Sequence, residues 1–269
     1  MIVDISDADF QRLVNFIKSN YGINLAQKRQ LITSRLASLL QQEGYSSFTP
    51  FVDKLLKERN PNNIEQVLNR LTTNYTYFMR EEEHFRFFER VVLPDLVRKH
   101  QRDKVLSIWS AGCSSGEEPY NISMYIKEFL GNQASSWDTR VLATDISQRV
   151  LATAKRGIYE LPDNMPENFR KRYFTPVKGT NQYQVVPMIK DNVIFQTFNL
   201  MDPIRFRLKF DVIFCRNVMI YFDQPTKDAL VRRFYDATVP GGYLMIGHSE
   251  NLSKDSPYRT VAPSTFQKR

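Results

Sequence analysis

Apolar residues in the first 100 positions recur with the three-to-four-residue spacing of amphipathic helices. The pattern predicts helices over residues 8–22, 25–44, 46–59 and 64–100. Gly22 and Gly44 are suited to end the first two helices, because glycine readily adopts the left-handed conformation of a helix C-terminus. We expect the last helix to be interrupted near TTNYTYF, which is rich in β-branched and aromatic residues. The sequence therefore predicts a small helical unit in the N-terminal part of the chain.

From about residue 102 the pattern changes to short apolar runs that alternate with helical segments. It predicts strands over 104–109, 140–145, 192–198, 210–215 and 241–247, and helices over 117–130, 147–157 and 225–239. Repeated β-α units joined by short turns imply a parallel sheet with helices on both faces. Between 157 and 190 the pattern lapses into two short β-like pieces, which indicates a small insertion rather than a missing helix. The final segment, 256–269, is expected to form a hairpin at the sheet edge.

Composition narrows the class of protein. The 269 residues suffice for one large α/β domain and a small helical one. Two cysteines are too few for a disulfide framework or a zinc site, and none of the three histidines has metal-ligand spacing, so we expect no metal. No apolar run is long enough for a membrane span and no signal-peptide pattern is present, so we expect a cytoplasmic protein.

The net charge is +8, and residues 140–210 carry 12 Lys and Arg against 6 Asp and Glu. A basic surface of this kind suits nucleic acid, a membrane or an acidic protein, and equally suits a solvated loop. Charge alone leaves these alternatives open.

The stretch SIWSAGCSSGEEPY joins a predicted strand, a small-residue turn and a helix N-terminus, an arrangement that commonly binds phosphate. Gly112 and Gly116 do not form a dinucleotide fingerprint, and the G-K-[ST] of a P-loop is absent. Glu117 and Glu118 would repel a pyrophosphate, whereas a positively charged nucleoside such as S-adenosylmethionine removes that conflict. The two glutamates could also simply favour a helix N-terminus. Asp145, at the end of the next strand and suited to ribose hydroxyls, favours the cofactor.

Five separated motifs, GEEPY, ATDIS, FCRNVMIYFD, GGYLMIGHSEN and TTNYTYFMRE, together resemble the CheR family of chemotaxis-receptor methyltransferases. Met79 stands where that family usually has Phe, and the resemblance covers nearly the whole chain. It implies a Rossmann-like, class I methyltransferase sheet with a small N-terminal all-α domain and a small inserted antiparallel β-subdomain. The implied boundaries are 1–75 for the helical domain, 76–100 for a linker helix, and 101–269 for the methyltransferase domain, with the insertion at about 157–190.

The resemblance also implies the reaction, which is transfer of a methyl group from S-adenosylmethionine to receptor glutamates. The products are glutamate methyl esters and S-adenosylhomocysteine, and the process is chemosensory adaptation. Asn74, Thr76 and Arg80 are expected at the cofactor, contributed by the linker. Arg80 and Tyr221 are the candidate catalytic residues, with Tyr221 near the transferable methyl, although spacing alone favours a core aromatic at that position.

The remaining cofactor residues implied by the resemblance follow the strand ends. They are Glu118, preferred over Glu117, for the amino group or methionyl tail; Asp145 for the ribose; Asn199 and Leu200 beside the adenine; and Cys215 and Arg216 on the floor of the site.

Lys28 and Arg35 lie within the apolar arc of their predicted helix, where the resemblance implies contact with the acidic receptor coiled coil. Cations at the edge of a core that extend their charge into water would give the same pattern. In some family members the inserted β-subdomain binds a receptor C-terminal pentapeptide by strand addition, and its Arg170, Lys171 and Arg172 suit an acidic tail or a solvated loop. We expect a monomer without nucleic acid and without membrane insertion.

Three other functions compete with this interpretation. An RNA or DNA methyltransferase would suit the pI of 9.4, but the fourth strand ends in CRNVMIYF rather than an Asn-Pro-Pro-Tyr motif, and no aromatic-basic platform for bases is apparent. A non-enzymatic sensor of the cofactor would not need Arg80 and Tyr221. A nicotinamide-dependent dehydrogenase would need the missing glycine fingerprint.

Overall fold

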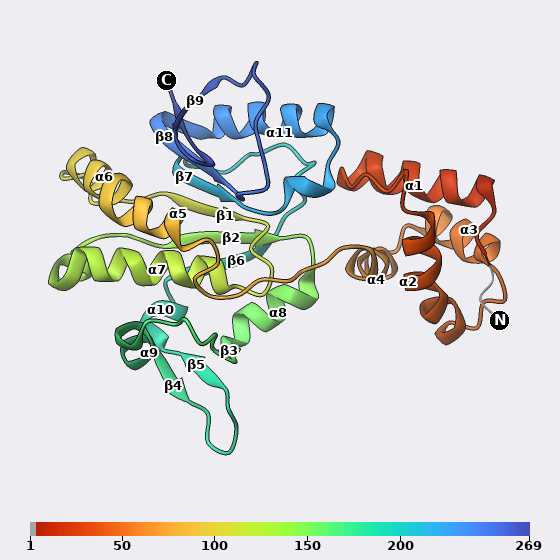
Figure 1. Cartoon of the computed structure of the whole chain (residues 1–269), viewed down its shortest axis with the longest axis horizontal. Coiled ribbons are helices and arrows are strands. Elements are labelled where there is room, and N and C mark those ends of the chain that lie inside the picture. The colour runs from red at the N-terminus through yellow and green to blue at the C-terminus, as the bar shows by residue number, and fades with distance from the viewer. Residues whose placement is uncertain (1–3) are drawn as a thin grey trace.

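The computed structural model describes residues 4–269, and its N-terminal part is helical (Figure 1). The helices are α1 (Asp7–Tyr21), α2 (Arg29–Gln42), α3 (Phe48–Glu58) and α4 (Pro61–Leu71). The predicted end of the first helix is confirmed, because Gly22 follows α1 with a left-handed φ of 73°. The second predicted helix, over residues 25–44, begins too early, because α2 begins at Arg29. Residues 25–28 are not helical, since Ile23 just before them forms a β-bridge with Phe222 and Leu25 is buried in the core.

The predicted interruption near TTNYTYF is confirmed. Residues 72–81, which we call the linker, contain no helix or strand. After it, α5 (Glu82–Phe87), the π-helical turn η1 (Phe88–Val92) and α6 (Leu93–Lys99) follow one another directly. The linker runs from α4 along the lower helices of the second half of the molecule (Figure 1).

A seven-stranded sheet forms the centre of the second half, with the order β6-β2-β1-β7-β8-β10-β9. The strands are β1 (Ile108–Ala111), β2 (Val141–Asp145), β6 (Val193–Thr197), β7 (Phe210–Cys215), β8 (Thr238–Ile246), β9 (Tyr258–Ala262) and β10 (Thr265–Lys268). The first five in the order are parallel, and β10 and β9 form the expected antiparallel hairpin at the edge. The predicted strand at 104–109 began too early, since β1 starts at Ile108.

Helices cover both faces of this sheet, as predicted. In Figure 1, α7 (Glu117–Leu130) and α8 (Gln148–Arg156) lie below it and α11 (Gln224–Ala237) lies above it. Short helical turns η2 (Gly131–Ser136) and η3 (Met219–Tyr221) follow α7 and β7.

The insertion projects from the lower side of the molecule (Figure 1). It contains the small antiparallel sheet β3-β5-β4, formed by β3 (Ile158–Tyr159), β4 (Phe174–Pro176) and β5 (Tyr183–Val185), and it ends in α10 (Pro187–Lys190). It also contains α9 (Glu167–Tyr173), which the sequence pattern did not predict. Phe169 and Tyr173, one helical turn apart, are buried in α9 and explain why this short segment is helical.

The N-terminal helices dock directly against the sheet half. The backbone N–H of Asn24 donates to the carbonyl of Tyr221 at 2.8 Å, and Lys18 Nζ lies 2.6 Å from Asp223 Oδ2 at the start of α11. Glu65 of α4 accepts the N–H of Arg149 in the first turn of α8 at 2.9 Å. One apolar cluster runs from α1–α4 into the sheet. Among residues 4–269, no helix combines the length and apolarity that crossing a bilayer requires.

Candidate functional site

A pocket lies where the strand order reverses, since β1 is flanked by β2 on one side and by β7 on the other. The linker and the segments that follow β1, β2, β6 and β7 line it, together with the end of α1. The predicted residues that the structure brings together there are Asn74, Thr76, Arg80, Glu118, Asp145, Asn199, Leu200, Arg216 and Tyr221. Cys215 does not line the pocket. Its thiol is fully buried in the core, and that burial raises its pKa well above the usual value.

The glycine turn after β1 is shaped by close packing. Gly112 has a φ of 81°, and a Cβ on it would lie 2.4 Å from the side chain of Val218. Gly116 has a φ of 99°, and a Cβ there would lie 2.7 Å from the Cβ of Ala154 in α8. Both glycines are therefore required by the approach of neighbouring elements, with or without a phosphate ligand.

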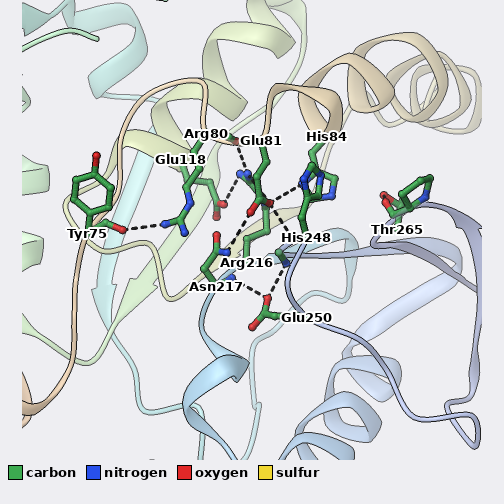
Figure 2. Close-up of polar contacts among 12 residues, drawn as sticks. Tyr75, Arg80, Glu81, His84, Glu118, Arg216, Asn217, His248, Glu250 and Thr265 are labelled. Atoms are coloured by element: carbon green, nitrogen blue, oxygen red, sulfur yellow. Dashed lines mark hydrogen bonds and ion pairs between the residues drawn. The ribbon is translucent and has the colours of Figure 1, made fainter. Parts of the chain in front are cut away.

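Glu118 and Glu117 occupy different environments. Glu118 Oε1 accepts a hydrogen bond from Ser110 at 2.7 Å, and Glu118 Oε2 lies 3.0 Å from Arg216 in an ion pair (Figure 2). Glu117 is buried outside the pocket, accepts from Ser115 Oγ at 2.7 Å, and has its pKa raised by burial. This difference supports Glu118 as the cofactor ligand, an assignment that stays a prediction.

Asp145 is held rigidly at the end of β2. Its two carboxylate oxygens accept the backbone N–H groups of Ser114 and Ser147, each at 2.9 Å. Burial raises its pKa despite these hydrogen bonds. The carboxylate keeps acceptor capacity for a ligand donor, which suits the predicted contact with ribose hydroxyls.

Asn199 and Leu200 follow β6, on the side of the pocket next to α1. Asn199 Nδ2 donates to the carbonyl of Asn20 at 2.8 Å, and its Oδ1 accepts the N–H of Met201 at 3.0 Å. Asn199 thus connects the helical half to this wall of the pocket, a contact that sequence analysis did not foresee. Leu200 is buried and contributes an apolar surface.

The linker closes another side of the pocket. Ser114 Oγ donates to the carbonyl of Asn74 at 2.8 Å, which ties the linker to the glycine turn. Arg80 donates to the carbonyl of Tyr75 at 2.9 Å (Figure 2), and its guanidinium lies 5.9 Å from the ring centre of Tyr77. Tyr221 lines the pocket and donates its hydroxyl to the carbonyl of Thr73 at 3.0 Å. Tyr221 is partly buried and its hydroxyl has a partner, while its place beside the transferable methyl stays a prediction.

An ion-pair network beside Arg80 was not predicted from the sequence. Glu81 lies 3.2 Å from Arg216 and accepts from Asn217 Nδ2 at 3.2 Å and from the N–H of His248 at 3.3 Å (Figure 2). Burial raises the pKa of Glu81, but the contacts with His84, Arg216 and Asn217 outweigh it and hold the pKa well below the usual range. Glu81 therefore remains ionised and joins the linker to the ends of β7 and β8.

The backbone at this network is unusual. Met79 and Glu81, on either side of Arg80, have φ values of 63° and 55°, which non-glycine residues rarely adopt. Arg216 also donates to the carbonyl of Arg80. The network thus holds Arg80 between two strained residues. In the sequence, the only sign of this network was the charged residues at the ends of FMRE (78–81) and GHSE (247–250).

Glu81, His84 and His248 also bring potential metal-ligand atoms within 4.8 Å of one another. Their positions along the chain gave no sign of this grouping, because His248 is remote from the other two. The guanidinium of Arg216 lies against the same Glu81 carboxylate and supplies positive charge there. An added cation would therefore face electrostatic repulsion from Arg216.

The residues predicted to dock the receptor are not equivalent. Lys28 is exposed just before α2, whereas Arg35 donates to the carbonyls of Arg70 and Thr72 at 3.1 and 3.5 Å, where α4 meets the linker. On the insertion, Arg170 lies 2.5 Å from Glu167, and Arg172 lies 2.6 Å from Glu128. Both arginines thus already have acidic partners in the protein.

Comparison with known proteins gives matches over nearly the whole chain. The model of "CheR methyltransferase, SAM binding domain" matches residues 74–267, and "CheR methyltransferase, all-alpha domain" matches residues 8–72. A chemotaxis protein methyltransferase of Borreliella burgdorferi is 39% identical, over 99% of this chain and 96% of that protein. The chemotaxis protein methyltransferase of Escherichia coli is 37% identical, over 93% of this chain and 86% of that protein.

A third relative, chemotaxis protein methyltransferase 1 of Pseudomonas aeruginosa, is 36% identical over 92% of both chains. Among solved structures, an S-adenosylmethionine dependent methyltransferase from Mesorhizobium loti has a TM-score of 0.30 and 16% identity, over 59% of this chain and 54% of that one. A similarity that low carries no conclusion about activity.

Proposed function

Because the chain belongs to the CheR methyltransferase family and is an S-adenosylmethionine-dependent methyltransferase, we propose that it methylates glutamate side chains of methyl-accepting chemotaxis receptors. The relatives that match over most of their length are named chemotaxis protein methyltransferases. The observation that carries the proposal is a pocket lined by an acidic side chain at the start of α7, Glu118, and by a basic side chain on the linker, Arg80. These charges suit a cationic cofactor and an anionic acceptor.

The residues present fit S-adenosylmethionine. Glu118 offers a carboxylate for the ammonium group, Asp145 offers lone pairs for the ribose hydroxyls, and Leu200 offers an apolar wall for the adenine. Arg216 Nε is buried at the pocket without a hydrogen-bond partner in the protein, so a donor is available for the cofactor's carboxylate. When bound, the cofactor supplies an electrophilic methyl group on a sulfonium.

The protein needs little acid–base chemistry for this reaction. A glutamate side chain has a reference pKa of about 4.3 and is already ionised at neutral pH, so no general base is required. Opposite charges are neutralised as the carboxylate oxygen reaches the methyl group, and water opposes that step because it stabilises both charges. The role of the chain is to align the two partners and exclude water, and alignment can contribute roughly 7–11 kcal/mol.

In this proposal Arg80 orients the incoming carboxylate, and the network around Glu81 fixes the backbone that carries it. Tyr221 keeps the linker over the pocket through its hydrogen bond to Thr73. A metal ion is not needed, since the nucleophile is already ionised and the leaving sulfide is neutral.

We place the receptor's cytoplasmic coiled coil against the exposed N-terminal end of α2, next to Lys28. A C-terminal receptor tail would add a strand at the outer edge of β4, one of the two end strands of the small sheet. The protein would act as a monomer in the cytoplasm, without nucleic acid and without inserting into the membrane.

The test is incubation with methyl-labelled S-adenosylmethionine and receptor-containing membranes, followed by mild alkali. Label on a receptor-sized protein that is released as volatile methanol supports a carboxyl methyl ester. Alkali-resistant label, or label on added RNA, would overturn the proposed substrate. Binding of the cofactor without transfer to any acceptor would favour a sensor instead.

A further inference from the structure

Buried polar atoms without a hydrogen-bond partner are concentrated at one place in this protein. Among residues 4–269, they belong to His84, Asn121 and Arg216. Asn121 and Arg216 both line the cofactor pocket, whereas His84 does not. Leaving such a group unpaired is unfavourable, because the group gives up its hydrogen bonds to water and gains none in the protein. Two unpaired polar groups at a single pocket therefore indicate that the ligand of that pocket supplies their partners.

Asn121 is the more informative of the two. It lies in α7, three residues after Glu118, so both side chains project from the same face of the helix. Its side chain is 1% exposed, and neither Oδ1 nor Nδ2 has a partner in the protein. An asparagine that served only to pack α7 against its neighbours would be replaced with benefit by an apolar residue of the same size.

The chemistry of these groups points to one part of the cofactor. The Asn121 amide offers two N–H donors and one acceptor oxygen, and Arg216 Nε offers one more N–H donor. Glu118 adds a carboxylate on the same helix. An α-amino acid end carries a carboxylate, which needs donors, and an ammonium, which needs acceptors. An adenine could also pair with a side-chain amide, but Asn121 projects beside the Glu118 carboxylate on α7, whereas the apolar wall expected at the adenine is Leu200 on the segment after β6.

We propose that Asn121 is a binding residue for the amino-acid end of S-adenosylmethionine, acting together with Arg216 Nε and Glu118. This inference rests on the proposed function, and it assigns to Asn121 a role that the family resemblance did not give it. Asn121 selects ligands that carry the amino-acid end over nucleosides that lack it.

The test compares two ligands by calorimetry. S-adenosylhomocysteine carries the amino-acid end, and 5′-methylthioadenosine keeps the adenosine and sulfur but lacks that end. We expect Asn121→Leu to weaken S-adenosylhomocysteine binding about tenfold and to change methylthioadenosine binding less than twofold. Asn121→Ala repeats the measurement without the risk of overpacking. The melting temperature of the ligand-free Asn121→Leu variant should be unchanged or higher, because no hydrogen bond within the protein is lost.

Asn192 provides the matched control. Its amide donates to Ser123 Oγ and to the carbonyl of Thr139, outside the pocket. Asn192→Ala should lower the melting temperature and leave the ratio of the two affinities unchanged. Unchanged S-adenosylhomocysteine affinity in both Asn121 variants, or equal loss for both ligands, would overturn the inference. If the unaltered protein binds neither ligand, the proposed function fails as well.

Discussion

Glu81, which is partly buried, forms an ion pair with the buried Arg216, with 3.2 Å between Glu81 Oε2 and a terminal guanidinium nitrogen of Arg216. The two residues come from the end of the linker and the end of β7, which are more than 130 positions apart in the chain. Arg216 also contacts Glu118 in the pocket. A single guanidinium therefore connects the strained backbone around Arg80 to the candidate cofactor ligand.

Removing Glu81 should destabilise the protein. We expect Glu81→Ala to lower the free energy of unfolding by about 3 kcal/mol, because it leaves Arg216 buried with one charge partner fewer. Glu81→Gln preserves the shape and should cost less. Urea denaturation measures both effects. Glu83→Ala is the control, since Glu83 is largely exposed and pairs only with Arg86. A loss below about 1 kcal/mol for Glu81→Ala would contradict the role of this ion pair.

Replacing Arg80 should affect turnover more than cofactor binding. We expect Arg80→Ala to lower the turnover number about a hundredfold, because the acceptor carboxylate loses its orienting cation, and to change the cofactor dissociation constant less than threefold. Single-turnover methylation and calorimetry with S-adenosylhomocysteine measure the two quantities. Arg86→Ala, on the exposed side of α5, should change neither. Unchanged turnover together with unchanged affinity would exclude the proposed role of Arg80.

The proposed receptor contact at the N-terminal end of α2 can be tested separately from the site. We expect Lys28→Glu to raise the KM for the receptor several-fold without changing cofactor affinity, if the proposed contact with acidic receptor helices is made by Lys28. Arg35→Glu should also weaken receptor methylation, but it removes hydrogen bonds at the junction of α4 and the linker and should lower stability too. Lys57→Glu on α3 is the charge-matched control. Equal effects of Lys57→Glu and Lys28→Glu would point to non-specific attraction instead.

His100 should make stability depend on pH. Burial alone lowers its pKa, but Asp103 and Asp211, at 3.1 and 2.9 Å, raise it above the usual value. The stabilisation from a raised pKa is complete below the unfolded value of about 6.5 and is lost as the pH rises through the folded value. His100→Gln should therefore reduce the free energy of unfolding by about 1 kcal/mol more at pH 5.5 than at pH 9. Urea denaturation at both pH values tests this, and an equal loss at both would contradict it.

Most elements of the fold could be predicted from local sequence, because their signals are local. The end of α1 at Gly22 and the alternation of strands and helices after residue 102 depend on nearby residues only. The errors occurred where distant contacts decide the conformation. Residues 25–28 carry a helical pattern but remain non-helical because Ile23 pairs with Phe222. The helix α9 was missed because its buried face consists of two aromatic residues in a segment too short to show periodicity.

In the candidate site, too, residues in local motifs could be predicted and residues placed by distant contacts could not. Motifs at the strand ends indicated Glu118 and Asp145, and the structure brings both to one pocket. The network around Glu81 depends on left-handed backbone at Met79 and Glu81, which no propensity favours. Asn121 resembles any polar residue in a helix until its burial is known. Cys215 was expected on the floor of the site, yet an apolar strand end is just as compatible with the core position that it occupies.

The contacts of Asn20 with Asn199 and of Asn24 with Tyr221 make the N-terminal helices part of the pocket. The helical part of the chain binds the wall and the rim of the pocket through Asn199 and Tyr221, and Tyr21 and Ile23 line the pocket themselves. The helical part therefore cannot be exchanged with that of a relative without changing the pocket. We expect a chain reduced to residues 73–269 to lose methyltransferase activity, because one side of the proposed cofactor pocket would open to solvent.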